Sequence, residues 1–204
     1  MRAARIVLAA SLALVSATVL ARVGDGPETL RGPADFAGIA DPRQRSLALF
    51  AEMGKVIRSP RCLNCHPRTD SPTQGDAMTL HSPPVTRGPR GEGVTAMRCR
   101  TCHGDANVAF SGSEGSIPGD PHWHLAPREM AWQGRTLGQI CRQMSDPSRN
   151  GGKSLAQLVE HNGEDHLVGW AWRPGPGRKP APGTQALFGA LTQAWVDSGA
   201  ACPD

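Results

Sequence analysis

The sequence predicts a mainly α-helical, loop-rich fold, and three observations lead to this fold class. Apolar residues recur at helical spacing in a few segments that begin with capping residues, and no segment alternates like a strand. The stretches between these segments are rich in turn formers, among the 24 glycines and 18 prolines of the 204 residues. Aromatic residues make up only 4% of the chain and tyrosine is absent. Such a chain needs a further source of core to offset its backbone entropy.

The first 21 residues are typical of a secretory signal peptide. Arg2 and Arg5 precede an apolar run from Ile6 to Leu20, and a cleavage site after Ala21 follows small residues. The run is short for a bilayer span, although an uncleaved N-terminal anchor stays open as an alternative. We therefore expect an exported chain, residues 22–204, that works in the periplasm with no membrane span after cleavage.

The first helix is expected after Asp41, which would cap it, with Pro42 at its first position. Apolar residues at helical spacing run from Leu47 to Ile57, and Pro60 ends the pattern. Residues 67–98 and 104–134 are dominated by Pro, Gly, Ser, Thr and charged residues, so we expect ordered loops there.

Two capping boxes, Thr136-x-x-Gln139 and Ser154-x-x-Gln157, predict two short helices in the C-terminal part, about 135–204. We expect Asn162-Gly163 to end the second of these helices. Residues 173–183 form a Pro/Gly-rich connector, and a last helix is expected from about residue 185.

Two Cys-x-x-Cys-His motifs, residues 62–66 (CLNCH) and 99–103 (CRTCH), predict the missing part of the core. This spacing is the attachment signature of c-type haem. Four thiols would bind two haems covalently: Cys62, Cys65, Cys99 and Cys102. The adjacent His66 and His103 would be the proximal iron ligands. The alternatives are a zinc site, a redox dithiol or simple disulfides, but a histidine directly after the second cysteine fits haem better than a tetrahedral site.

Two porphyrins would act as large apolar plates in place of aromatic side chains. The sequence thus predicts one small, cytochrome c-like, two-haem domain over residues 22–204. The formal charge of +4 is small and the basic residues are scattered, which argues against a nucleic-acid partner.

Cys141 and Cys202 are the two cysteines left over. In an oxidising compartment an even pair predicts a disulfide, which would fix the last helix to the helix that carries Cys141. Two unpaired buried thiols are the alternative.

The second axial ligands of the irons are expected among three histidines, His81, His124 and His161, with Met130 in reserve. If residues 122–124 are extended, His122 and His124 point to opposite sides. His124 precedes an apolar stretch, so we expect His124 to be buried. His161 shares a helix face with an apolar neighbour and should face the core, whereas His166 lies among acidic residues and should be solvated.

The stretches CLNCHP, PPVTRG, MRCRTCHG, WHLAP-x-x-MAW, DPSRNGG, LVGWAW and PAPGTQALFGALTQAW resemble bacterial dihaem c-type proteins known as isoquinoline 1-oxidoreductase subunits. The resemblance covers nearly the whole of residues 22–204. It implies a cytochrome that accepts electrons, with a molybdenum hydroxylase-type dehydrogenase as one expected partner. His81, His124, Met130 and His161 fall within the shared stretches. No stretch resembles a molybdopterin or iron–sulfur subunit, so no hydroxylase activity is carried over.

The sequence therefore predicts a periplasmic dihaem cytochrome that passes single electrons between redox proteins, such as a dehydrogenase or a respiratory-chain component. One alternative is a haem enzyme, peroxidase-like or acting on another small molecule, with one open iron. Another is a sensory or structural haem subunit. Arg98 and Arg100 flank Cys99 and would pair with haem propionates or a partner's carboxylates, or else form a solvated charged face. The five tryptophans are expected to pack around the haems.

Overall fold

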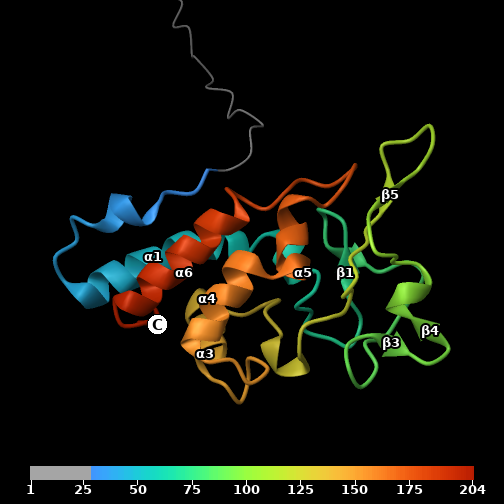
Figure 1. Cartoon of the computed structure of the whole chain (residues 1–204). Helices are drawn as coiled ribbons and strands as arrows, with labels where there is room; N and C mark the ends of the chain where they lie inside the picture. Colours follow the sequence, from blue (N-terminus) through green and yellow to red (C-terminus); the bar gives the residue numbers. More distant parts are fainter. Residues whose placement is uncertain (1–28) are drawn as a thin grey trace, which may run out of the picture.

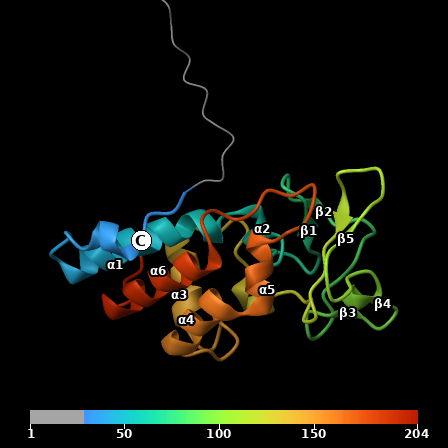
Figure 2. The same cartoon turned by 45° about the horizontal axis from the view of Figure 1, so that its top comes forward.

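The computed structural model describes residues 29–204, and the expected signal peptide lies outside the described residues. A helical layer and a loop-rich part lie side by side (Figures 1 and 2). The helical layer contains α1 (Pro42–Ile57), α3 (Leu137–Ser145), α4 (Leu155–Glu164) and α6 (Gln185–Asp197). The short helices are η1 (Pro33–Phe36), α2 (Pro60–Leu63), η2 (Cys99–Thr101), η3 (Arg128–Met130), α5 (His166–Gly169) and η4 (Trp170–Trp172). The expectation of a mainly helical chain is confirmed.

The predicted helix starts are confirmed by their caps. The Asp41 carboxylate accepts a hydrogen bond from the Gln44 amide at 2.7 Å. Thr136 and Ser154 both form complete capping boxes at the starts of α3 and α4. These starts depend on side chains within three residues of the helix, which is why the sequence alone specifies them.

The prediction that Asn162-Gly163 ends α4 is wrong, because the helix continues to Glu164. Asn162 is buried and donates to the Thr192 hydroxyl of α6 at 3.1 Å. A Cβ atom on Gly189 of α6 would lie 2.5 Å from the Cα of Gly163. These residues therefore permit the close approach of α4 and α6.

The main core lies between α6 and the helices α1 and α4. Trp195 of α6 is fully buried, with its ring centroid 5.1 Å from that of Phe50 on α1. The Ser46 hydroxyl of α1 donates to the Trp195 carbonyl and accepts from the Ala201 amide. The C-terminal segment is thus fixed to the first helix.

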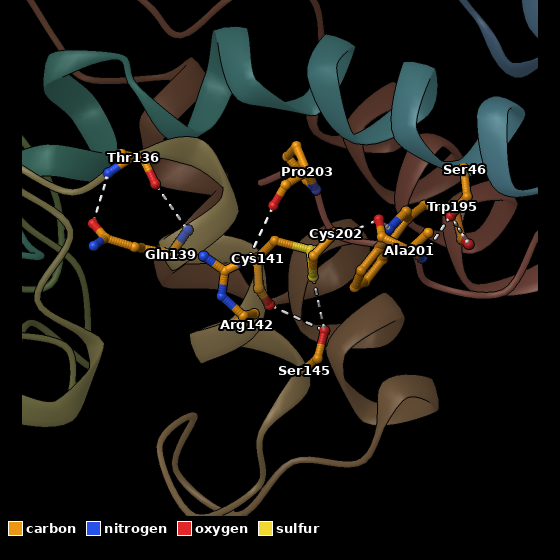
Figure 3. The surroundings of a disulfide bond; sticks show 10 residues. All are labelled: Ser46, Thr136, Gln139, Cys141, Arg142, Ser145, Trp195, Ala201, Cys202 and Pro203. Carbon is orange, nitrogen blue, oxygen red and sulfur yellow. Dashed lines mark hydrogen bonds between the residues drawn. A yellow bond between two sulfur atoms is a disulfide. The ribbon is translucent and has the colours of Figure 1, made fainter.

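A disulfide joins Cys141 of α3 to Cys202, which confirms the predicted pair (Figure 3). Arg142 donates to the Pro203 carbonyl at 3.0 Å on the same side of α3. The disulfide and this hydrogen bond both tie the end of the chain to α3.

The loop-rich part contains three two-residue antiparallel strand pairs, where the sequence showed no strand pattern. They are β1 (Thr73–Gln74) with β2 (Thr79–Leu80), β3 (Gly93–Val94) with β4 (Met97–Arg98), and β5 (Val108–Ala109) with β6 (Ser116–Ile117). Strands of two residues are too short to show alternation. Within residues 29–204, no helix is long and apolar enough to cross a membrane.

Candidate functional site

The two Cys-x-x-Cys-His motifs adopt the same backbone turn. The His66 amide donates to the Cys62 carbonyl at 3.1 Å, and the His103 amide donates to the Cys99 carbonyl at 3.0 Å. Residues three and four positions apart share one face of such a helical turn. In each motif the two cysteines and the histidine therefore lie three and four positions apart along one helical turn, which is the spacing that attachment to one porphyrin requires.

The imidazoles of both motifs are oriented in the same way. The Nδ1 of His66 lies 2.8 Å from the Met130 carbonyl oxygen, and the Nδ1 of His103 lies 2.7 Å from the Pro118 carbonyl oxygen. Since a carbonyl only accepts, each Nδ1 carries the proton and donates it. The Nε2 atom of each ring is left as the basic nitrogen, which is the arrangement typical of metal-binding histidines.

A tryptophan lies flat against each of these imidazoles. The ring centroids of His66 and Trp132 are 3.5 Å apart with planes at 7°, and those of His103 and Trp123 are 4.7 Å apart with planes at 17°. That the five tryptophans pack around haems stays a prediction, and two of them stack on the motif histidines. Stacking and the Nδ1 hydrogen bond together hold each ring in a fixed orientation.

Burial favours the neutral form of both imidazoles. Desolvation lowers the pKa of His66 to about 3, although the hydrogen bond to the Met130 carbonyl opposes the shift. Desolvation also lowers the pKa of His103. A neutral imidazole is the form that binds a metal.

Desolvation raises the pKa of three of the motif thiols. The pKa of Cys62 rises to about 12, that of Cys65 to about 11, and that of Cys99 is also raised. A redox dithiol instead needs a lowered thiol pKa, because the thiolate is the nucleophile. All four motif thiols are unpaired, whereas Cys141 and Cys202 are bonded to each other.

A cavity of about 640 Å³ brings residues of the two motifs together. This volume falls within the roughly 300–1,000 Å³ typical of ligand sites. The second motif lines the cavity with Cys99, Cys102 and His103, and the first motif adds Cys65. Cys62 and His66 lie outside this cavity. The cavity is therefore large enough for a ligand beside all three residues of the second motif. For the first motif, the observations that agree with haem attachment are its backbone turn and the orientation of His66.

His81 also lines the cavity, close to His103. The two ring centroids are 5.9 Å apart with planes at 62°, and the Nδ1 of His81 donates to the Pro83 carbonyl at 2.8 Å. A separation and angle of this kind are those of an edge-to-face ring contact. The contact places His81 and His103 side by side at the same cavity wall.

The expectation that His124 is buried is wrong. Its side chain is exposed, and its Nδ1 donates to the carbonyl of His122. A turn at Pro121 and His122 replaces the expected extended backbone, so the inward and outward alternation does not apply. His124 nevertheless borders the same cavity.

The remaining expected ligands have other contacts. His161 is partly exposed rather than turned fully into the core, and its Nδ1 lies 3.2 Å from the Asp165 carboxylate. It is near enough to His66 to lower the pKa of that ring electrostatically. The Met130 side chain packs in the core, while its carbonyl accepts from His66 on the Nδ1 side, away from Nε2. His166 is largely exposed, as expected, but pairs with the buried Asp120.

The arginines expected to meet propionates are paired with carboxylates at the surface. Arg98 lies 3.3 Å from Glu92, and Arg100 pairs with Asp105. The sequence analysis missed Arg61, Arg87 and Arg178, which line the cavity and are more deeply buried than Arg98 and Arg100. Arg61 directly precedes Cys62, and this position was the only sequence signal for it.

Comparisons with known proteins add no assignment: no family model, no curated protein and no solved structure matches the chain. Among residues 29–204, no group of three or more His, Cys, Asp or Glu side chains is arranged to hold a metal ion by itself.

Proposed function

We propose that the chain is an exported electron-transfer protein that binds two c-type haems and passes single electrons between periplasmic redox proteins. One expected partner is a molybdenum hydroxylase-type dehydrogenase. The observation that carries the proposal is the equivalence of the two motifs. Each has the same Cys-to-His turn, and each histidine donates Nδ1–H to a backbone carbonyl.

The chain's own residues would supply attachment, ligation and exclusion of water. Cys62 and Cys65, and Cys99 and Cys102, would each bind one porphyrin through thioethers. His66 and His103 would be the proximal ligands, held neutral by burial. Haem, when bound, supplies a reversible one-electron couple. A ring fixed by a carbonyl and a tryptophan keeps its position in both redox states, which favours electron transfer.

The distal ligand proposed for the second haem is His81. Its support is the 5.9 Å separation from His103 within the shared cavity. For the first haem, His161 is the proposed ligand because its Nδ1 lies 3.2 Å from the Asp165 carboxylate, which leaves its Nε2 free to bind. His124 borders the cavity as the alternative to His81, and Met130 is the less favoured ligand because its carbonyl already orients His66.

A haem enzyme is the second candidate, and a difference between the motifs favours it. Both motif histidines stack on a tryptophan, but among the described residues only His103 also has another histidine ring beside it. An iron at the first motif without a second protein ligand would be open to peroxide or another small molecule.

A ligand-binding spectrum separates the two candidates. The purified protein would be reduced with dithionite, and its visible spectrum recorded before and after addition of carbon monoxide. An unchanged spectrum means that both irons hold two protein ligands and supports the electron carrier. A carbon monoxide adduct at one haem would place the enzyme first.

A further inference from the structure

The walls of the cavity carry an excess of positive charge. The charged residues that line it are one aspartate, Asp76, and four arginines: Arg61, Arg87, Arg98 and Arg178. Arg98 is half exposed and pairs with Glu92, which does not line the cavity. The other three arginines are less exposed, so their charge is less screened by solvent.

Arg61 is the most deeply buried of the three and has unused donors. Its side chain is 1% exposed, and its Nη2 donates to Asp76 at 2.6 Å. Its Nε and Nη1 have no hydrogen-bond partner among the described residues. Donors of a buried charged group that are left unpaired lose their hydrogen bonds to water without replacement, which is unfavourable. The guanidinium also lies 5.9 Å from the centroid of the Trp170 ring, so the two nitrogens without a hydrogen-bond partner are the donors that an acceptor from outside the chain would satisfy.

Arg87 and Arg178 are held mainly by uncharged groups. Arg87 donates to the Ala126 carbonyl at 2.5 Å, and its Nε lies 3.6 Å from Asp70. Arg178 donates to the hydroxyl and the carbonyl of Ser116. Carbonyls and hydroxyls fix the position of a guanidinium but leave its charge, so the cavity stays electropositive.

We infer that Arg61, together with Arg87 and Arg178, binds the propionate carboxylates of the porphyrin attached at Cys99 and Cys102. This inference rests on the proposed function and names residues other than those expected from the sequence. Arg100 does not line the cavity and pairs with Asp105. A carboxylate is the anion that matches a guanidinium in shape and charge.

The first test compares the midpoint potentials of purified holoprotein variants that retain two covalent haems. Removing a positive charge beside the porphyrin favours the oxidised state. We therefore expect Arg61→Gln to raise the ratio of oxidised to reduced protein about ten-fold for one haem, which is a fall of about 59 mV for a one-electron couple. The matched control is Arg100→Gln, which removes the same charge from an exposed site. It should change the ratio less than about three-fold, because solvent and salt screen it.

The second test detects the carboxylates directly and uses the conservative variant Arg61→Lys. Protein labelled with ¹³C at the propionate carboxyls is studied by redox-induced infrared difference spectroscopy. Arg61→Lys should shift the isotope-sensitive carboxylate bands, and Arg100→Gln should leave them in place. If Arg61→Gln cannot be purified with both haems attached, the infrared bands of Arg61→Lys still test whether Arg61 contacts a propionate.

The results of these tests distinguish a failure of the Arg61 assignment from a failure of the proposed haem-binding function. If both haems are present and neither the potentials nor the carboxylate bands respond to changes at Arg61, the inference is overturned and the proposed function stands. If the parent protein carries no covalent haem, the proposed function fails and the inference fails with it.

Discussion

The imidazole of His81 lies 5.9 Å from that of His103, centroid to centroid, although 22 positions separate the two residues in the sequence. Both rings donate Nδ1–H to a backbone carbonyl, Pro83 for His81 and Pro118 for His103. The pair therefore has two oriented imidazoles at one cavity, which supports the proposal that both bind one iron.

This relationship predicts opposite results for two histidine variants. His81→Ala should open one iron, so that carbon monoxide binds to one of the two haems after reduction. His124→Ala should leave the spectrum unchanged, because the His124 side chain is exposed to solvent. Carbon monoxide difference spectra of both variants provide the measurement. A new adduct in His124→Ala but not in His81→Ala would contradict the assignment.

The disulfide between Cys141 and Cys202 should contribute strongly to stability. It closes a loop of 61 residues, for which the chain-entropy model gives roughly 4 kcal/mol. The double variant Cys141→Ser/Cys202→Ser should lose most of this free energy of unfolding, as measured by urea denaturation. Haem content should stay at the parent level, because the four motif thiols are unchanged. Equal stability of the parent and the variant would exclude this contribution.

The close contact between Gly163 and Gly189 should leave no room for a side chain at position 189 of α6. A Cβ at position 189 would lie 2.5 Å from the Cα of Gly163, so the two helices must separate. Gly189→Ala should destabilise the protein by about 1–3 kcal/mol, although alanine favours helix more than glycine. Gln193→Ala, at an exposed position of α6, is the control and should change stability by less than about 0.5 kcal/mol. Thermal unfolding of both variants tests the prediction, and equal melting temperatures would refute it.

Glu52 should make the stability of the helical layer depend on pH. Desolvation raises the pKa of this carboxyl, but hydrogen bonds from Lys55 and Arg31 outweigh it, so the pKa lies below its ordinary value. The contribution is therefore complete above the unfolded pKa of about 4.3 and is lost as the pH falls through the folded value.

Glu52→Gln should accordingly lower the free energy of unfolding at pH 7 by about 1–3 kcal/mol. The difference from the parent should shrink as the pH falls below the unfolded pKa of about 4.3 and the parent's carboxyl becomes protonated. Urea unfolding of both proteins across this range provides the comparison. A difference that does not change with pH would contradict the ionic role of Glu52.

The sequence predicted the features that depend on near neighbours. The caps at Asp41, Thr136 and Ser154 need only residues within one turn, and all three are confirmed. The motif turns are likewise local. The disulfide followed from counting cysteines in an exported chain, and its pairing is confirmed.

The features that the sequence did not predict depend on distant segments. Gly163 resembled a helix end, but its role is set by Gly189, which lies on another helix. Arg61 resembled any charged residue, and only the fold buries it beside Asp76. His124 was misjudged because a local turn, which alternation does not describe, directs its ring to the carbonyl of His122.

The central claim is that the chain binds two haems covalently, and counting haems on the denatured protein tests it most directly. The mature protein would be purified from a host that matures c-type cytochromes and extracted with acid acetone. Its intact mass and its alkaline pyridine haemochrome spectrum would then be recorded. The account predicts two haems per chain that survive extraction. A mass equal to that of the polypeptide alone, with no haemochrome bands, would contradict it.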